Sequence, residues 1–291
     1  MILSVGEALV EIMRPRRGIP LDRPDTFAGP LASGAPAIFA SVAARRGAPT
    51  ALCAVVGDDP FGALLRQRLA GDGVDVGRVR AEAGAPTGCA FVAYADDGTR
   101  SFVFHVGAAA RLVAADLGEL PERAAWLHVS GSSLALAPSL ADVVETASAR
   151  VHAAGGRISL DPNMRPEALS PDLAERLVRI AGRAAVLLPS EGELAAFGLD
   201  DTAAPVVCTT LGAAGVRVRT GSHEETIAVP AVDEVDPTGA GDTFAAAFVV
   251  ATLAGADPVE AAREAVEVAA TGVAHLGPME APVASRRRGR A

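Results

Sequence analysis

The 291-residue sequence predicts an α/β protein in which a mostly parallel central sheet is flanked by helices. Two observations carry this prediction. Apolar runs of strand length, such as residues 51–56 and 126–130, alternate with helical patterns, such as residues 138–154. A buried strand, a turn and a helix recur in that order, which is typical of parallel strands joined by crossover helices. Because no internal repeat or low-complexity linker divides the chain, we predict a single domain over residues 1–291.

The predicted elements follow in chain order. Residues 2–5 and 9–12 are strand-like, and residues 14–30 are rich in Pro and Gly and are predicted to be irregular. Residues 35–46 form a helix that ends at Gly47, a natural C-terminal cap. The further predicted elements are strands at 51–56, 126–130, 157–160, 186–188, 206–209, 216–219 and 226–229, and helices at 61–70, 138–154, 171–181, 243–256 and 258–270.

Residues 87–106 break this alternation. An Asp-Gly turn at residues 96–98 lies between two strand-like segments, which predicts a β-hairpin. A hairpin that projects from an α/β body can serve as a lid, and residues 9–12 can join it. An edge hairpin of the main sheet is the alternative, and the residues alone leave both open.

Composition excludes several classes of protein. The net charge of −9 and the pI near 5.1 leave no basic face for a nucleic acid. The basic residues are all Arg, so a lysine Schiff base or a P-loop lysine is excluded. Three widely spaced cysteines in apolar surroundings indicate reduced thiols, and the uncharged run at 243–256 is too short for a membrane span. We therefore expect a cytoplasmic protein without a membrane or nucleic-acid partner.

Residues 235–244 have the layout of an anion site. Gly239 and Gly241 let the backbone turn tightly, so that consecutive N–H groups point toward one place where a helix begins. Negative charge that develops on a transferred phosphoryl group can be stabilised there, and Asp242 can accept a proton from an attacking hydroxyl. A Gly-rich turn with Asp242 as an ordinary helix cap is the alternative.

The decapeptide at 235–244 resembles the second signature of the ribokinase-like (PfkB) family of sugar kinases. This resemblance, which extends over nearly the whole chain, implies a ribokinase-like sheet and a small β-sheet lid, formed here by about residues 9–30 and 87–106. It implies that Asp242 is the catalytic base, that residues 239–242 form the anion hole, and that ATP with Mg²⁺ is the phosphoryl donor. Family members often bind a monovalent cation such as K⁺ beside this loop, and Asp236 and Thr238 match two of its ligands.

The N-terminal signature of the family is matched less well. Residues 57–62 follow it closely, whereas residues 33–40 depart twice. Ser33 stands where a second glycine is usual before Gly34, and Ile38 stands where an asparagine commonly contacts sugar hydroxyls. An apolar group there changes which hydroxyl pattern is accepted, because an unpaired hydroxyl is costly. Ile38 as plain helix core is the alternative. Ser33 and Gly34 remain candidate substrate contacts.

Residues 161–165 follow a predicted strand, at the edge where open α/β sheets bind ligands. They resemble the Asp-x-Asn-x-Arg element of 2-keto-3-deoxygluconate kinases and fructokinases. The resemblance implies that Asn163 contacts the sugar and that Arg165 reaches the sugar or the phosphoryl group, where it contributes to catalysis. A solvated turn capped by Asp161 is the alternative.

Residues 188–193 resemble the Asn-x-x-Glu element of the family, with Ser190 in place of the asparagine. Glu193 is then expected to hold Mg²⁺ through water, which suits a hard cation. A first-turn carboxylate beside the helix dipole is the alternative for Glu193. Thr210, Gly212 and Gly215 match the nucleotide-binding turn of the family.

Two further candidate substrate contacts come from the predicted lid. Glu11 stands where an acidic group often binds sugar hydroxyls, and His105 stands where deoxygluconate kinases tend to have an arginine for the carboxylate of the sugar acid. An exposed strand carboxylate and a structural histidine are the respective alternatives. The other histidines have no metal-ligand spacing, so we expect no zinc.

We therefore expect an ATP-dependent sugar kinase, with 2-keto-3-deoxygluconate as the favoured acceptor. Fructose or another ketohexose or pentose is the next alternative, followed by a nucleoside and by a non-catalytic sugar sensor. The intact run at residues 236–244 argues against a sensor, which needs no catalytic base. Kinases of the family that the chain resembles often form homodimers through the lid, and the apolar lid residues Phe91, Phe102 and Phe104 would allow such pairing here.

Overall fold

The computed structural model describes residues 1–163 and 169–286, and these residues form two sheets. The larger sheet has nine strands in the order β13-β12-β11-β10-β9-β8-β1-β4-β5. Its strands pair in parallel from β11 to β5, and β12 and β13 extend it with antiparallel pairing. The strands are β1 Ile2–Val5, β4 Thr50–Gly57, β5 Asp75–Glu82, β8 Trp126–Ser130, β9 Arg157–Asp161, β10 Val186–Leu187, β11 Val206–Thr210, β12 Val216–Thr220 and β13 His223–Ile227.

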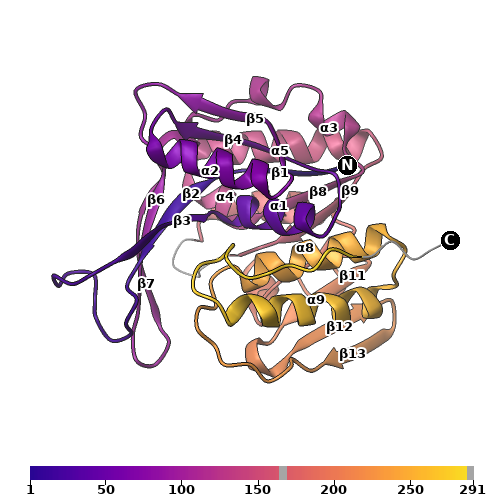
Figure 1. The fold of residues 1–291 in the computed structure, drawn as a ribbon. Coiled ribbons are helices and arrows are strands. Elements are labelled where there is room, and N and C mark those ends of the chain that lie inside the picture. The colour runs from indigo at the N-terminus through magenta and orange to yellow at the C-terminus, as the bar shows by residue number, and fades with distance from the viewer. Residues whose placement is uncertain (164–168, 287–291) are drawn as a thin grey trace.

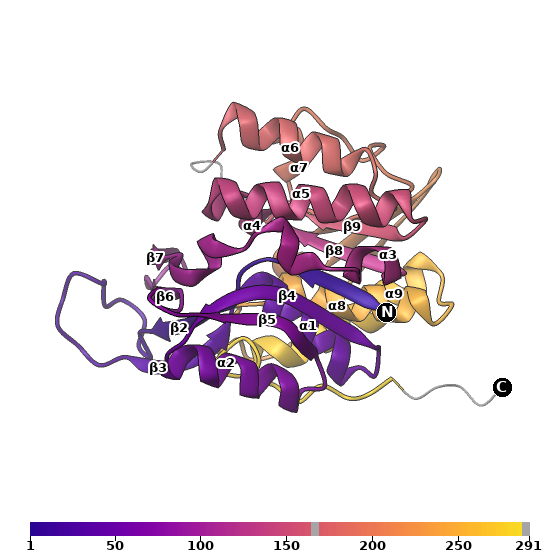
Figure 2. The ribbon, with the colours of Figure 1, turned by 90° about the horizontal axis from the view of Figure 1, so that it is seen from above.

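Helices cover both faces of this sheet (Figure 2). One face carries α1, α2, α8 and α9, and the other carries α3, α4, α5, α6 and α7. The strand side chains alternate between the two layers, so Ile2 packs into one core and Leu3 into the other. The helices are α1 Ala35–Arg45, α2 Pro60–Gly71, α3 Leu120–Arg123, α4 Gly131–Leu136, α5 Pro138–Ala153, α6 Pro171–Ala181, α7 Glu193–Ala196, α8 Ala240–Leu253 and α9 Pro258–Val273, with short 3₁₀ turns η1 Gly107–Arg111, η2 Ala114–Leu117 and η4 Gly212–Ala214.

The smaller sheet has the strand order β3-β2-β6-β7 and projects from one side of the body (Figure 1). Its strands are β2 Leu9–Met13, β3 Ala28–Ser33, β6 Cys89–Tyr94 and β7 Arg100–His105. The predicted α/β class with a second small sheet is confirmed. The alternative in which the hairpin lies at the edge of the main sheet is wrong, because β6 pairs with β2 and not with a strand of the main sheet.

Two strands differ from the predictions. β3 occupies the end of the segment predicted to be irregular, because its Gly29 and Pro30 lower strand propensity while β2 still supplies a pairing partner. β5 was absent from the predicted elements. It lies at the edge of the main sheet and exposes Asp75 and Arg78, so it lacks the continuous apolar run of the central strands.

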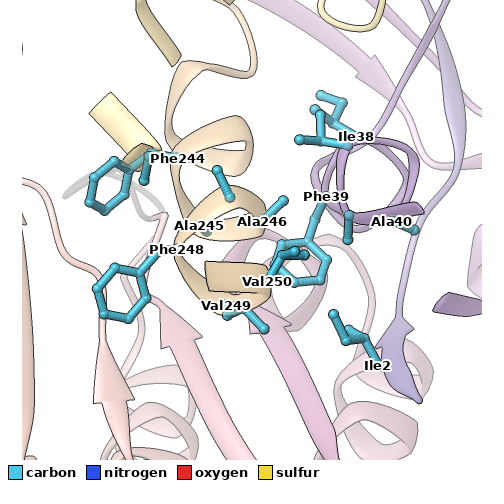
Figure 3. Packing of buried hydrophobic residues seen from close by; sticks show 14 of the residues in the cluster. Ile2, Ile38, Phe39, Ala40, Phe244, Ala245, Ala246, Phe248, Val249 and Val250 are labelled. Carbon is cyan, nitrogen blue, oxygen red and sulfur yellow. The ribbon is translucent and has the colours of Figure 1, made fainter. Parts of the chain in front are cut away.

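The predicted anion site lies at the N-terminus of α8, and the packing of this helix in the body holds the site in place. The helix is apolar on all sides, which is typical of a helix with neighbours all around. Figure 3 shows Phe39 of α1 beside Val250 of α8, and Phe244 and Phe248 along a second side of α8. This packing fixes the N-terminus of α8 relative to the sheet. Within residues 1–163 and 169–286, no helix has both the length and the apolar character needed to cross a membrane.

Candidate active site

The N-terminus of α8 is built as the sequence predicted. Gly239 precedes the helix with a φ of +76°, a left-handed conformation that favours glycine. A Cβ added there would lie 3.0 Å from Pro278 Cβ and 3.2 Å from Ile38 Cδ1. Ala240 donates its N–H to the Pro237 carbonyl in a long bond of 3.3 Å. The first N–H groups of a helix lack partners within it, so this turn can receive an anion.

Asp242 is the third residue of α8, and its carboxyl group is buried. The residue is 6% exposed, and Oδ1 has no hydrogen-bond partner among the described residues. The pKa of Asp242 is raised to about 8, mainly by burial and also by the charge of Glu7, while the charge of Arg100 opposes the rise. A carboxyl group in this state is suited to accept a proton.

Asp161 lies directly beside this turn. Its Oδ2 would be 3.6 Å from a Cβ at Gly241, and Asp161 is the last paired residue of β9, opposite Ser130. Burial raises the pKa of Asp161 well above its ordinary value, and the charges of Glu193 and Asp242 add to the effect. Carboxyl groups from β9, α7 and α8 therefore converge on the predicted phosphoryl site.

These carboxyl groups do not form a protein-only metal cage. Within the part of the chain that the structure describes, no three His, Cys, Asp or Glu side chains are arranged to hold a metal ion. Glu193 Oε2 accepts from the Ser190 N–H at 2.7 Å. One or two carboxylates near a phosphate site suit Mg²⁺, which is usually held by few protein ligands together with substrate phosphates and water. The donor set thus fits Mg²⁺ that arrives with a nucleotide.

The predicted nucleotide turn lies at the ends of β10 and β11. Ser190 pairs with Thr210 in an isolated bridge, and the two hydroxyls are 3.4 Å apart. Gly215 has a φ of +112°, and a Cβ there would lie 2.1 Å from the Ile227 carbonyl oxygen, so only glycine fits. Gly212 has a φ of +58° with open space around its Cβ position. The structure therefore brings these four residues to one edge of the sheet.

Glu11 and Ser33 form a second polar group between the small sheet and the body. Ser33 Oγ donates to Glu11 Oε2 at 3.1 Å, whereas Glu11 Oε1 has no partner among the described residues. Burial, together with the charge of Asp236, raises the pKa of Glu11 to about 7. Gly34 has a φ of +103°, and a Cβ there would be 2.7 Å from the Glu7 carbonyl oxygen. Ile38 is buried in the helix core.

Both carboxylate oxygens of Asp236 accept hydrogen bonds from described residues. Its Oδ1 accepts from Tyr94 Oη at 2.9 Å and from the Thr238 N–H at 3.0 Å, and its Oδ2 accepts from the Gly277 N–H at 3.0 Å. The Tyr94 hydroxyl is also 2.7 Å from Thr238 Oγ1. Tyr94 belongs to β6, so the small sheet is tied to the loop that leads into α8. A cation bound by Asp236 and Thr238 would compete with the Tyr94 hydroxyl for their oxygen atoms.

The two faces of the small sheet differ in chemistry. Tyr94 pairs with Arg100, and Glu11 pairs with Ala90, so these side chains share one face, from which Tyr94 reaches Asp236. His105 pairs with Cys89 and therefore lies on the opposite face, where its ring meets Phe91 edge-on at 6.5 Å. The cation whose charge lowers the pKa of Glu11 and opposes the rise at Asp242 is Arg100, not His105.

Asn163 follows β9 with a φ of +41°, the one positive φ at a non-glycine residue among those described. Its N–H donates to Asp161 Oδ1 at 2.9 Å, and its Nδ2 donates to Ser130 Oγ at 3.3 Å. A left-handed conformation at such a residue is uncommon and is often found at functional sites. Arg165, the catalytic candidate two residues later, lies outside the described residues.

Glu7, Tyr94 and Arg100 also lie near the site, although no sequence motif marks them. Glu7 is 2% exposed and receives hydrogen bonds from Ser132 and Ser133. The one signal for Glu7 was a carboxylate directly after a buried strand. Tyr94 and Arg100 reach the site only because the hairpin folds onto the body, which no local pattern reports.

Comparisons with known proteins agree with this geometry. The chain matches the family model for pfkB family carbohydrate kinases over residues 2–284. Fructokinase-1 of Oryza sativa subsp. japonica is 33% identical over 267 residues, which are 86% of this chain and 82% of that protein.

Solved structures give the same result. A protein from E. coli, provisionally assigned as ribokinase II and solved in complex with ATP and Mg²⁺, is 34% identical with a TM-score of 0.89, over 96% of this chain and 94% of that one. A fructokinase from Vibrio cholerae O395, solved with fructose, ADP and calcium, is 28% identical with a TM-score of 0.80, over 96% and 94% of the two chains. The predicted family is confirmed: this chain belongs to the pfkB family of carbohydrate kinases.

Proposed function

We propose that this carbohydrate kinase transfers the γ-phosphoryl group of ATP to a hydroxyl of a ketohexose of the fructose type, with Asp242 as the base. The observation that carries the proposal is the buried Asp242 carboxyl group at the N-terminus of α8, whose Oδ1 has no hydrogen-bond partner in residues 1–163 and 169–286. The rice and Vibrio relatives are named fructokinases, which supports fructose over the 2-keto-3-deoxygluconate favoured from sequence.

In the proposed reaction, the acceptor hydroxyl gives its proton to Asp242 as its oxygen attacks the γ-phosphorus, and ADP leaves. The N–H groups of Gly239, Ala240, Gly241 and Asp242 stabilise the charge that develops on the phosphoryl oxygens. Arg165 is proposed to add positive charge there. Catalysis of this kind depends mainly on positioning and electrostatics, which suits a rigid helix end packed between α1 and α9.

The nucleotide is proposed to lie along Ser190, Thr210, Gly212 and Gly215, whose glycines permit close backbone approach. Glu193 would hold Mg²⁺ through water, and the ion supplies neutralising charge for the phosphates. Asp236 and Thr238 remain proposed ligands for K⁺, in competition with the Tyr94 hydroxyl. Rates measured with K⁺ and with tetramethylammonium as the monovalent cation test that assignment.

The sugar is proposed to lie between the small sheet and the body, against Glu11, Ser33, Gly34 and Asn163. Residues 9–30 and 87–106 are proposed to act as a lid on a single domain. The Tyr94–Asp236 hydrogen bond supports a lid, because it joins the small sheet to the loop before α8. Exposed Phe27 and Val103 and the edge-on pair of Phe91 and His105 support a homodimer through the outer face of the lid.

A sugar acid such as 2-keto-3-deoxygluconate is the second candidate, and Arg100 is the observation that favours it. Its charge acts on Asp242, Glu11 and Tyr94 from the inner face of the small sheet. A guanidinium at that place is suited to pair with a substrate carboxylate. If the acceptor is a sugar acid, Arg100→Ala raises its KM far more than it raises the KM of fructose.

The test is the rate of ADP release with Mg²⁺-ATP and each of fructose, 2-keto-3-deoxygluconate, ribose, tagatose and adenosine. The proposal expects fructose or tagatose to give the highest kcat/KM. A preference for 2-keto-3-deoxygluconate would establish the second candidate. Nucleotide binding without ADP release, over this panel and a wider one of neutral and acidic sugars, would contradict the proposed kinase and favour a sugar sensor.

A further inference from the structure

A chain of hydrogen bonds crosses the carboxyl ends of three neighbouring strands, β9, β8 and β1. Asn163 Nδ2 donates to Ser130 Oγ at 3.3 Å, the Ser130 and Ser132 hydroxyls are 2.9 Å apart, and Ser132 Oγ donates to Glu7 Oε1 at 2.8 Å. Ser133 Oγ donates to the other oxygen, Glu7 Oε2, at 2.5 Å. An exposed amide in the proposed sugar site is thus connected to a fully buried carboxylate.

The carboxylate fixes the direction of every bond in this chain. An ionised carboxylate only accepts hydrogen bonds, so Ser132 must donate to Glu7. The Ser132 oxygen then accepts from Ser130, and the Ser130 oxygen accepts from the Asn163 amide. Burial raises the pKa of Glu7, but the serine donors oppose that rise because they stabilise the ionised form. For an ionised Glu7, the single hydrogen of each hydroxyl leaves no second arrangement.

The backbone of Asn163 is held as firmly as its side chain. Its left-handed φ of +41° is fixed by the N–H bond to Asp161, which lies beside Gly241 of the phosphoryl turn. Since Nδ2 is turned to Ser130, Oδ1 faces away from the chain of serines. Asn163 therefore presents an acceptor, and not a donor, next to the place where the acceptor hydroxyl must meet Asp242.

We propose that Glu7 is a positioning residue that, through Ser132 and Ser130, fixes the Asn163 amide so that Oδ1 accepts a hydrogen bond from a hydroxyl of the sugar. The inference rests on the proposed sugar kinase function and assigns a role to a residue outside the family motifs quoted above. It implies selectivity for a substrate that donates a hydroxyl at this point. A deoxy analogue that lacks that hydroxyl leaves Oδ1 unpaired and binds more weakly.

The test compares Glu7→Gln and Ser132→Ala with the wild type, using the best acceptor of the sugar panel. A glutamine at position 7 can donate to Ser132 and so lets the chain reverse, whereas alanine at position 132 breaks it. Both variants are expected to raise the KM for the sugar by about 2- to 10-fold, the size of one net hydrogen bond, and to leave the KM for ATP unchanged. Ser41→Ala is the matched control, because Ser41 is a buried serine that donates to Asp72 away from these strand ends.

The decisive experiment is the double variant that combines Glu7→Gln with Asn163→Ala. If Glu7 acts through Asn163, Glu7→Gln adds no further rise in sugar KM once the amide is gone. An undiminished rise in the Asn163→Ala background, or equal rises in the KM for sugar and ATP, would overturn the proposal. If Glu7→Gln does not fold, the same comparison is made with Ser132→Ala. A wild-type protein that phosphorylates no acceptor would instead contradict the proposed function, which separates the two failures.

Discussion

Asp236 lies in the loop before α8, and Asp242 lies six residues later in the first turn of that helix. The two aspartates have opposite hydrogen-bonding environments. Both are buried, at 1% and 6% exposure. Asp236 accepts hydrogen bonds from Tyr94, Thr238 and Gly277, whereas Asp242 Oδ1 has no partner among the described residues. Burial alone does not distinguish a structural carboxylate from a reactive one. The number of donors around the carboxylate does.

The difference has a thermodynamic consequence. Hydrogen bonds offset the cost of burying the ionised group at Asp236, and nothing comparable is present at Asp242. The carboxyl group of Asp242 is therefore held in a state that is costly to the fold and useful for accepting a proton. This is the stability cost expected of a site that is prepared for charge transfer.

The largest expected effect is on turnover. Asp242→Asn keeps the shape of the side chain but cannot accept the proton, so kcat should fall by about 10²- to 10⁴-fold. The rate of ADP release measures this change. Asp172→Asn is a matched control, because Asp172 lies in the first turn of α6 and is exposed. Turnover of Asp242→Asn within a few-fold of the wild type would contradict its role as the base.

The second effect is on stability. Asp236→Asn replaces an acceptor of three hydrogen bonds with an amide that has one acceptor oxygen, which leaves a buried donor unpaired. The free energy of unfolding in urea should fall by about 1–3 kcal/mol. If the Asn variant unfolds at the wild-type midpoint with the wild-type slope, Asp236 does not hold the loop.

The smallest effect is at the contact between the two sheets. Tyr94→Phe removes one hydroxyl from Asp236 and Thr238 and should cost about 0.5–1.5 kcal/mol of unfolding free energy. Urea unfolding measures it, and the double variant with Asp236→Asn should show less than the sum of the two losses. Additive losses would mean that Tyr94 stabilises the fold without acting through Asp236.

Much of the fold was predictable because central parallel strands are buried on both faces. Trp126–Ser130 is a continuous apolar-rich run and was predicted with its observed bounds. The edge strand Asp75–Glu82 was missed because half of its residues face solvent, and Ala28–Ser33 was missed because pairing with β2 outweighs its Gly and Pro. Tertiary pairing decided both cases.

The site residues also fall into those that a local motif reveals and those that only tertiary contacts bring together. Asp242 and its glycines lie within one short segment, so a local motif reveals them. The Tyr94–Asp236 bond joins residues 142 positions apart, and the Ser132–Glu7 bond joins residues 125 positions apart. The register of β7 on β6 puts His105 opposite Cys89, on the face that does not carry Tyr94 and Glu11. Contacts between distant residues, and the sheet face on which a side chain lies, depend on strand register and are seen only in the folded structure.

The most direct test of the account is thermal unfolding of the unliganded wild type, Asp242→Asn and Asp236→Asn at pH 5 and pH 9. The pKa of Asp242 is raised from its ordinary 3.8 to about 8. A raised carboxyl pKa gives stability that is full below pH 4 and is lost as the pH rises through about 8. Asp242→Asn is expected to gain Tm relative to the wild type between pH 5 and pH 9, while Asp236→Asn is expected to be less stable than the wild type at pH 9. A loss of Tm at pH 9 that is equal in the two variants would contradict it.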